Sequence, residues 1–418
     1  MEYQRQKLLI VTNLYPLPWE PNRASFNRQQ FEHLKKTFDI ALIIPVAFAD
    51  YFKHRKVIVN TDKIRYVPSF YIPKIGRRFN GHYMYHSIMA TSSRWIKTFA
   101  PDKVLGSWVF PEGLAVQKIA KKLNIPYFIK AHGSDVNAHA DNPVRSKIIK
   151  QVANNSSGVL SVSQALASKM IDMGVEGKKI HVIYNGVDKA MFTPTTPNED
   201  LTGQSYSRTI TFIGNLKKEK GVHELLSAFG KIKAEHLDLK LSFIGNGPEE
   251  STLKLKAESM GIADSVRFLG SISHDKLPQI MCNSTLIALP SYAEGVPNVV
   301  LESISCGTPV VVTNVGGIPE VVCDGMNGFI AQPKNVESLH KAFSCALSHT
   351  WDKEMIQLSS ELFCWETNRV AFAAMLNCVT VKKQQMIDSA DIVNNISPIT
   401  INARNGAFGG QPKTVVNG

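Results

Sequence analysis

The chain has 418 residues, of which 44% are hydrophobic and 20% charged, a composition typical of a globular protein with room for two domains. Its longest apolar run near the N-terminus, ALIIPVAFA at 41–49, is far shorter than the roughly 18 residues that suggest a membrane span. The formal net charge is +12, but no helix-turn-helix, RNP-like or zinc-finger pattern accompanies it, so no nucleic-acid partner is expected.

Two further features bear on the compartment. The start, MEYQRQKLLIVTN, has no small-residue cleavage site, so we expect no signal peptide and a cytoplasmic protein. Six cysteines fall in the second half without CxxC spacing, which predicts reduced, mostly buried thiols and no zinc site.

Apolar segments alternate with helical ones over residues 1–190, and this pattern predicts one doubly wound, Rossmann-like α/β unit. The expected parallel strands are KLLIVT (7–12), ALIIPV (41–46), KVLGSW (103–108), PYFIKA (126–131), GVLSVS (158–163) and HVIYNG (181–186). The loop at 14–31 is long for a connection between a strand and a helix, which favours a binding role. Ser163 is the expected N-cap of a helix that ends before Gly174.

Basic residues are concentrated in this first unit, where 28 Lys and Arg stand against 13 Asp and Glu. Within it, eight basic residues alternate with apolar ones: Lys53, Arg55, Lys56, Lys63, Arg65, Lys74, Arg77 and Arg78, with Phe70, Tyr71, Ile72 and Phe79. One interpretation is a surface that meets an anionic membrane or a diphosphate-bearing lipid. The other is an ordinary solvated loop region.

The same alternation returns after a polar linker at 191–208 and predicts a second Rossmann-like domain at 209–360. The expected strands are TITFIGN (209–215), LKLSFIGN (239–246), VRFLGS (266–271), TLIALPS (285–291), TPVVVTN (308–314) and GFIAQP (328–333). Between the first two, apolar residues at i, i+3, i+4, i+7 and i+10 from Val222 predict a helix. A helix at 361–380 and a flexible tail at 381–418 complete the chain.

Several residues suited to binding or catalysis follow predicted strands, where ligands bind in open α/β sheets. His132 and Asp135 follow 126–131; the histidine either donates to a sugar hydroxyl or phosphate or has a structural role. Lys220 lies at a predicted helix start, where the helix dipole disfavours a cation unless an anion such as a phosphate binds beside it; the alternative is an ordinary solvated lysine on a turn. The glycines of GNGPEE (245–250) allow a close backbone approach to a ligand.

The segment YAEGVPNVVLESIS (292–305) places two glutamates around a helix start. Pro297 suits the first helical position, so Glu294 lies in the preceding loop and Glu302 about one turn inside the helix. The free N–H groups of such a helix start bind anions. No catalytic triad, HExxH pattern or acidic DxD cluster stands out, so no metal and no cofactor is expected.

These motifs together resemble the retaining glycosyltransferases of family 4, which have the GT-B fold of two facing Rossmann-like domains with an interdomain cleft. EGVPNVVLESISCGTPVVVTNVGGIPEVVCDGMNGFI is similar to the E-x7-E signature of that family and its continuation. FIGNLKKEKG, FIGNGPEE, VRFLGSIS and IYNGVD also correspond to family motifs, and the resemblance extends from residue 7 to about 375. The HGSD loop is similar to that of enzymes that build bacterial surface polysaccharides.

The resemblance implies a role for each residue of the predicted site. Glu302 would accept hydrogen bonds from the donor ribose, Glu294 would contact the transferred sugar, and Lys220 would neutralise the leaving diphosphate. His132 would face the reaction centre, and the segment near Phe363, Trp365 and Phe372 would pack back across the first domain. The remaining donor-binding residues are Asn298, Val299, Val300, Asn215, Gly245, Gly247, Gly270 and Ser271, of which Gly270 and Ser271 would hold the base.

One position departs from the family. Asn215 stands where the family usually has an arginine that contacts the diphosphate. Loss of a charged donor at such a site costs on the order of 10²-fold in rate, unless Lys217, Lys218 or an arginine of the first domain compensates.

The predicted function is a hexosyltransferase-type reaction that moves a sugar from a nucleoside diphosphate sugar to an acceptor hydroxyl with retention. The expected acceptor is a lipid-linked glycan of cell-surface polysaccharide synthesis, with the enzyme peripheral on the inner face of the membrane. The alternatives are a sugar-nucleotide epimerase of the same fold and a non-catalytic scaffold protein that binds nucleotide sugars.

Overall fold

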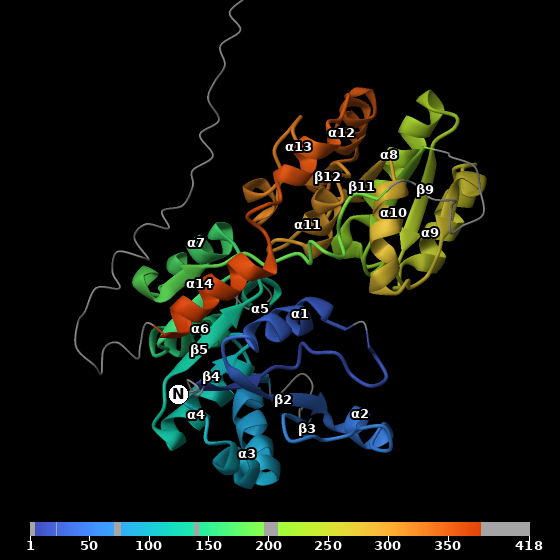
Figure 1. Ribbon diagram of the computed structural model, residues 1–418. Helices are drawn as coiled ribbons and strands as arrows, with labels where there is room; N and C mark the ends of the chain where they lie inside the picture. Colours follow the sequence, from blue (N-terminus) through green and yellow to red (C-terminus); the bar gives the residue numbers. More distant parts are fainter. Residues whose placement is uncertain (1–4, 22, 71–76, 138–141, 196–207, 378–418) are drawn as a thin grey trace, which may run out of the picture. The chain divides into compact units, whose positions relative to one another are not determined.

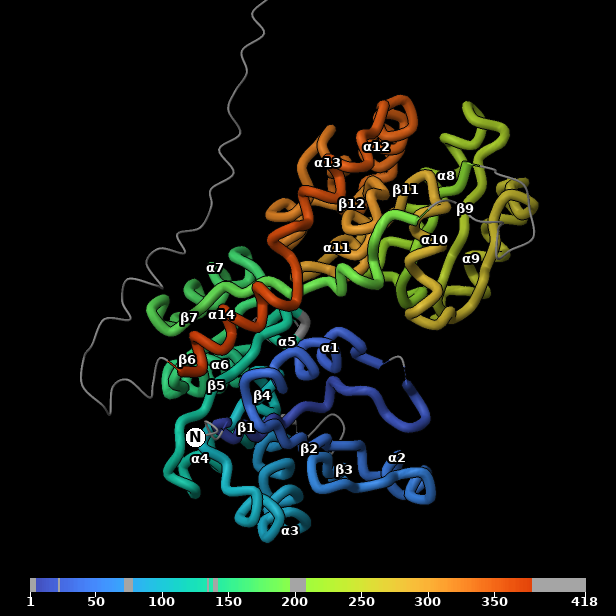
Figure 2. The backbone as a smooth tube through the Cα atoms, in the orientation of Figure 1, coloured from blue at the N-terminus to red at the C-terminus, as the bar shows by residue number. Residues whose placement is uncertain are grey.

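The computed structural model describes residues 5–21, 23–70, 77–137, 142–195 and 208–377 (Figures 1 and 2). Most of the predicted linker and the whole predicted tail at 381–418 lie outside the described residues. The described residues form two parallel sheets, each with its own helices. No helix in the described part of the chain is both long and apolar enough to cross a membrane.

The first sheet has seven parallel strands in the order β3-β2-β1-β4-β5-β6-β7. Its strands are β1 (Lys7–Val11), β2 (Asp39–Ala47), β3 (Ile64–Ser69), β4 (Lys103–Gly106), β5 (Tyr127–Ala131), β6 (Gly158–Ser161) and β7 (Ile180–Val182). Every residue of β4, β5 and β6 is buried, as expected for central strands covered on both faces.

Strand β3 is the one strand of this sheet that the sequence analysis missed. It pairs with β2 in parallel from Leu42 opposite Ile64 to Ala47 opposite Ser69, and it lies at the sheet edge. Only Val67 of its six residues is buried, so the segment lacks the continuous apolar character of a central strand. Such polar, proline-containing strands are typical of sheet edges.

Among the residues that the structure describes, seven α-helices connect these strands: α1 (Ser25–Leu34), α2 (Phe48–Lys53), α3 (Asn80–Phe99), α4 (Glu112–Leu123), α5 (Ser134–Asn137), α6 (Pro143–Asn154) and α7 (Gln164–Asp172). Helix α4 packs against both α3 and α6, while α1 packs against the C-terminal helix. The chain crosses from β1 to β2 in one direction along the sheet and from β4 to β5 in the other. Because such crossovers are right-handed, α1 and α4 lie on opposite faces of the sheet.

The predicted ends of α7 are confirmed. The Ser163 hydroxyl oxygen accepts a hydrogen bond from the Leu166 amide at 3.1 Å, as an N-cap does. After the last helical residue, Gly174 has a φ of 87°, the left-handed conformation that ends a helix at low steric cost for glycine.

The second sheet has six parallel strands in the order β10-β9-β8-β11-β12-β13. They are β8 (Thr209–Ile213), β9 (Lys240–Ile244), β10 (Val266–Phe268), β11 (Leu286–Leu289), β12 (Val310–Thr313) and β13 (Gly328–Ala331). The helices are α8 (Val222–Glu235), α9 (Glu250–Ser259), α10 (Leu277–Asn283), α11 (Asn298–Ser305), α12 (Val336–Ser348), α13 (Lys353–Leu358) and α14 (Trp365–Asn377). The five α8 residues predicted from spacing to face the core are all fully buried.

The last helix, α14, packs against α1 and β6 of the first sheet, as the family resemblance implies. The Trp365 indole N–H donates to the Gln29 side chain at 3.1 Å. The Gln30 amide donates to Asn368 Oδ1 at 2.8 Å, and the Asn368 amide donates to the Tyr184 carbonyl at 2.7 Å. The chain therefore returns to its first sheet after building its second.

The cysteines within the described residues are all unbridged. Only Cys282 and Cys306 are buried, whereas Cys323 is exposed and Cys345 and Cys364 are partly exposed. The prediction of mostly buried thiols is therefore wrong.

Candidate functional site

The segment with the two glutamates forms a loop and the helix α11. Pro297 is the N-cap residue with an extended ψ of 129°, so the helix begins at Asn298, one residue later than predicted. The Val300 amide donates to the Pro297 carbonyl at 3.1 Å. The earlier amides, of Asn298 and Val299, are therefore the ones available to an anion at this helix start.

Lys220 and Glu294 form an ion pair. Lys220 closes the 3₁₀ turn Lys218–Lys220, two residues before α8, and its Nζ lies 2.5 Å from Glu294 Oε1. Glu294 is largely buried, with 12% of its side chain exposed, and Lys220 is 31% exposed. The Glu294 carboxylate is thus the anion that offsets the unfavourable interaction of Lys220 with the helix dipole.

Glu302 lies on α11 and is 7% exposed. Its Oε1 is 2.9 Å from Nε2 of His274, which lies in the turn before α10. Burial lowers the pKa of His274, but the hydrogen bond to Glu302 and the charge of that carboxylate outweigh it and raise the pKa above its ordinary value. His274 belongs to no sequence motif noted above, because no local pattern pairs it with a residue 28 positions away.

Glycines bring together the ends of β8, β9 and β10. The Gly245 amide donates to the Gly270 carbonyl at 2.7 Å, and the Gly214 amide donates to the Ile244 carbonyl at 2.9 Å. A Cβ on Gly245 would lie 2.0 Å from the Gly214 carbonyl oxygen, and a Cβ on Gly247 would lie 2.2 Å from that of Leu216. Only glycine fits at these positions, so the loops pack backbone to backbone.

The HGSD loop after β5 is organised by Asp135. One carboxylate oxygen accepts from the His132, Gly133 and Val136 amides at 3.0–3.1 Å, and the other accepts from the Val109 amide at 3.0 Å. Burial raises the pKa of Asp135 and these four donors oppose that rise. The aspartate therefore fixes the loop that presents His132.

His132 is held in a neutral state at the end of β5. Its Nε2 lies 3.0 Å from the Ser107 hydroxyl, and its ring packs against Phe26 with centroids 5.6 Å apart. Burial, and then the nearby Lys130, lowers the pKa of His132 well below its ordinary value. A neutral imidazole can donate one hydrogen bond and accept another, but it contributes no charge.

The HGSD loop touches the loop that carries Glu294. A Cβ on Gly133 would lie 3.3 Å from the Gly295 Cα, and a Cβ on Gly295 would lie 2.9 Å from the His132 carbonyl oxygen. The Asn185 amide also donates to Asn298 Oδ1 at 3.0 Å. These contacts bring the predicted residues His132, Glu294 and Asn298 into one neighbourhood.

The other predicted residues fall into two groups. Gly245, Gly247 and Gly270 meet in the glycine-lined loops described above, and Ser271 follows them in an exposed position. Asn215 is exposed, and its carbonyl accepts from the Lys217 amide at 2.8 Å. Lys217 and Lys218, the neighbouring lysines that would supply the missing charge, are both exposed.

Solved structures with the same architecture identify the fold. Sucrose-phosphate synthase from Thermosynechococcus elongatus matches with a TM-score of 0.75 at 17% identity, covering 90% of this chain and 100% of that one. Anabaena Alr3699/HepE in complex with UDP-glucose matches with a TM-score of 0.69 at 18% identity, covering 89% and 100%. The two Rossmann-like halves are those of the GT-B fold.

Family models match both halves of the chain. Residues 28–190 match the model described as Glycosyltransferase Family 4, and residues 200–357 match Glycosyl transferases group 1. The chain belongs to glycosyltransferase family 4.

Curated relatives share parts of the sequence. N-acetyl-alpha-D-glucosaminyl L-malate synthase of Bacillus anthracis is 32% identical over 52% of this chain, and the match spans 57% of that enzyme. The putative teichuronic acid biosynthesis glycosyltransferase TuaC of Bacillus subtilis is 24% identical over 81% of this chain and 88% of its own length.

Proposed function

We propose that the protein transfers a sugar from a nucleoside diphosphate sugar to an acceptor hydroxyl with retention at the anomeric carbon. One arrangement carries this proposal: the Lys220–Glu294 ion pair lies beside the start of α11, and the buried Glu302 lies on the same helix. A cation and free helix amides suit a diphosphate, whereas carboxylates suit the hydroxyls on either side of it.

Each of these groups is assigned one part of the donor. Glu302 accepts from the ribose hydroxyls, Glu294 accepts from the hydroxyls of the transferred sugar, and the amides of Asn298 and Val299 hold the diphosphate. Lys220 exchanges its contact with Glu294 for the departing phosphate. Fixed charges and donors of this kind stabilise the charge that develops in the transition state.

The reaction needs no separate protein base. The bond between the anomeric carbon and the diphosphate oxygen breaks, and the acceptor oxygen bonds to that carbon on the same face. The acceptor proton passes to the departing phosphate oxygen. His132 is neutral and beside the reaction centre, so it orients hydroxyls through a hydrogen bond and the protein acts mainly by positioning.

The expected acceptor is a lipid-linked glycan in the synthesis of a cell-surface polysaccharide. Two observations support it: the relative TuaC is named for teichuronic acid biosynthesis, and the first half of the chain has an exposed aromatic surface with basic neighbours. Structures of the neighbour HepE contain UDP and UDP-glucose, which supports a nucleotide sugar as the donor.

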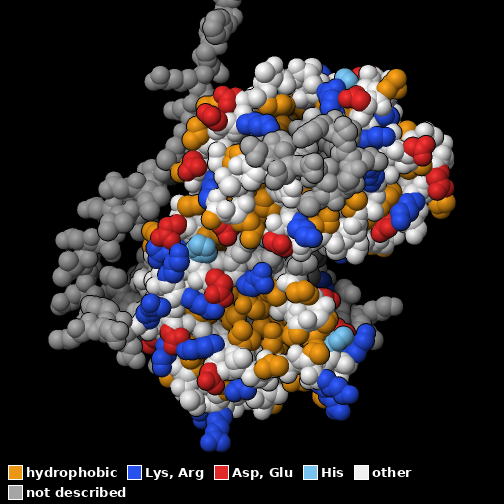
Figure 3. All heavy atoms as spheres, turned by 45° about the vertical axis from the view of Figure 1, so that its right-hand side comes forward, with side chains coloured by type: hydrophobic (Ala, Val, Ile, Leu, Met, Phe, Trp, Pro, Cys, Tyr) orange, Lys and Arg blue, Asp and Glu red, His pale blue; other side chains and the backbone are white. Residues whose placement is uncertain are grey.

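The aromatic surface lies near β3. Rings of five residues follow one another at centroid distances of 4.6–6.3 Å: Phe52, Phe48, Phe70, Tyr83 and Phe79. The four phenylalanines are 42–50% exposed, and exposed basic residues, among them Lys53, Arg55 and Lys56, lie beside them. Figure 3 shows hydrophobic side chains gathered on this half with Lys and Arg around them. We propose that this surface contacts an anionic membrane; Lys74, Tyr71 and Ile72 of the predicted cluster lie outside the described residues.

A panel of radiolabelled UDP-, GDP- and ADP-sugars with a membrane extract tests the proposal. We expect label to enter a lipid-extractable product whose new linkage, read by NMR, has the anomeric configuration of the donor. An inverted linkage would refute retention. Release of an epimerised nucleotide sugar, or tight binding of the donor without transfer or hydrolysis, would refute transfer and favour an epimerase or a scaffold protein.

A further inference from the structure

His274 joins two parts of the candidate donor site. It begins the 3₁₀ turn His274–Lys276, in the segment between β10 and α10 that also contains Gly270 and Ser271. Its Nε2 lies 2.9 Å from Oε1 of Glu302 on α11. The segment that the family resemblance assigns to the base is therefore bonded to the carboxylate that is proposed to accept from the ribose.

Both side chains of this pair are held in place. The His274 side chain is 17% exposed and the Glu302 side chain is 9% exposed. The imidazole packs edge-on against the buried Phe192 ring, with centroids 5.1 Å apart. The Phe192 carbonyl in turn accepts from the Ser305 hydroxyl at 2.6 Å, so the ring that supports the imidazole is attached to the helix that carries Glu302.

The two carboxylate oxygens of Glu302 have different surroundings. Oε1 is bonded to His274, whereas Oε2 has no hydrogen-bond partner among the described residues. An ionised carboxylate only accepts hydrogen bonds, so Nε2 of His274 carries the proton and donates it. Oε2 is thus left to accept from a hydroxyl of a ligand.

Recognition of a ribose is stronger when its acceptor is already oriented. Glutamate has a long, flexible side chain, and immobilising such a side chain during binding lowers affinity. A hydrogen bond to the charged carboxylate fixes it before the nucleotide arrives. We propose that His274 is a positioning residue for ribose recognition, which holds Glu302 through Oε1 and presents Oε2 to a ribose hydroxyl. The inference rests on the proposed function, in which Glu302 binds the donor ribose.

Ribonucleoside diphosphates and their 2′-deoxy and 3′-deoxy analogues test this inference without turnover. The Kd of UDP, GDP, ADP and each analogue is measured by isothermal titration calorimetry. We expect the wild type to bind at least one ribonucleotide about tenfold more tightly than one of its deoxy analogues. In His274→Leu this preference should fall to about twofold or less, because Glu302 is no longer oriented. His274→Gln should restore most of it, since its amide N–H takes the place of the imidazole Nε2–H.

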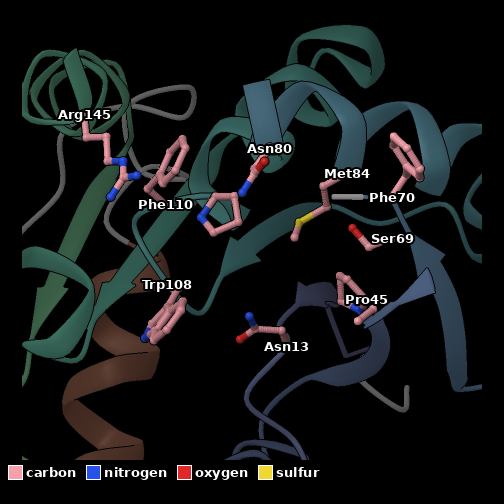
Figure 4. Close-up of a pocket in the computed structure, with 11 residues that line it drawn as sticks. Asn13, Pro45, Ser69, Phe70, Asn80, Met84, Trp108, Phe110 and Arg145 are labelled. Carbon is pink, nitrogen blue, oxygen red and sulfur yellow. The ribbon is translucent and has the colours of Figure 1, made fainter. Parts of the chain in front are cut away.

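Two control variants separate this effect from a general loss of structure. His340→Leu breaks a comparable pair, in which His340 Nε2 lies 2.8 Å from Oε1 of Glu235, the last residue of α8. Asn80→Leu changes a pocket of about 370 Å³ whose described lining comes entirely from residues 13–145 (Figure 4). Both variants should keep the ribose preference of the wild type, and thermal unfolding confirms that all variants are folded.

Loss of the preference in Glu302→Ala but not in His274→Leu would overturn the inference and leave Glu302 as the ribose acceptor. Equal weakening of ribonucleotides and deoxynucleotides in His274→Leu, or no recovery in His274→Gln, would show that His274 acts through packing alone and would also overturn it. A wild type that binds none of these nucleotides, or that binds ribonucleotides and deoxynucleotides equally, would contradict both the inference and the proposed role of Glu302.

Discussion

Lys220 and Glu302 test the donor site one residue at a time. Lys220→Ala removes the cation that we propose neutralises the leaving diphosphate, so kcat should fall by about 10²- to 10³-fold. Glu302→Ala removes the carboxylate that we propose accepts from the donor ribose, and it should raise the donor Kd with a smaller effect on kcat. Lys231→Ala, on the exposed side of α8 and paired with Glu337, is the control for loss of a lysine. Donor titration and initial rates measure both effects, and unchanged values in both variants would contradict the site assignment.

Glu112 predicts a pH dependence of stability. Burial raises its pKa from the ordinary value near 4.5 to about 8, and between these values the folded chain keeps a proton that the unfolded chain has released. The contribution of Glu112 to the free energy of unfolding therefore falls as the pH rises through this window, by up to about 1.4 kcal/mol per pH unit. Glu112→Gln removes this dependence, so the stability of the wild type relative to the variant should decline from about pH 5 to pH 8.

Urea unfolding at several pH values measures that difference. Glu258→Gln, an exposed carboxylate on α9, serves as the control and should run parallel to the wild type. A constant gap between wild type and Glu112→Gln would show that the glutamate is ionised in the fold.

Residues of the site differ in how easily they can be recognised from the sequence. Lys220, Glu294 and Glu302 belong to motifs, and the structure pairs or buries all three. His274 and Ser107 were missed, because their importance comes only from contact with Glu302 and His132 across the fold. Short-range spacing carries no information on such partners.

Helix α7 shows the same difference between a local partner, which sequence predicts, and a distant one, which it does not. Its Ser163 cap was predicted from local sequence, but the Glu320 carboxylate also accepts from the Gln164 and Ala165 amides at 2.8 and 2.7 Å. Glu320 is 156 residues away from Gln164, and it also accepts from the Tyr184 hydroxyl at 2.8 Å. This carboxylate satisfies first-turn amides and complements the helix dipole.

Glu320→Ala should therefore lower the free energy of unfolding by about 1–3 kcal/mol, because two amides and a hydroxyl lose a charged acceptor. Chemical denaturation measures the change. Glu337→Ala, which removes an exposed carboxylate paired with Lys231, should change stability much less, since exposed ion pairs contribute little. Equal effects of the two substitutions would contradict a special role for Glu320.

Strands were predicted best where both faces are covered. All six predicted strands of each sheet formed, since continuous Val, Ile and Leu segments are suited to burial on both sides. The edge strand β3 was not predicted because Arg65, Pro68 and Ser69 interrupt its apolar residues. The order of strands, and hence which loops lie side by side, depends on crossovers that no local pattern specifies.

At the scale of the molecule, charge is divided unequally: residues 1–190 hold 28 basic and 13 acidic residues, and residues 191–418 hold 19 and 22. We expect the protein to co-sediment with vesicles that contain anionic lipid at low salt and to dissociate as salt rises, since screening weakens surface charge. The double variant Phe48→Ser with Phe52→Ser should weaken binding, whereas Leu237→Ser with Leu255→Ser, exposed residues of the second half, should not. Absence of binding at low salt would refute the membrane proposal.

The return of α14 to the first sheet has a consequence for synthesis on the ribosome. The fully buried Lys130 ammonium group donates to Gln30 Oε1 at 2.7 Å, and Gln30 in turn donates to Asn368. Until residues 365–377 have been translated, Gln30 and Gln29 lack these partners and the surface of α1 that α14 covers remains open. The strands of the first sheet are complete by residue 182, yet the nascent chain acquires the last layer over that sheet only after the second sheet has been made.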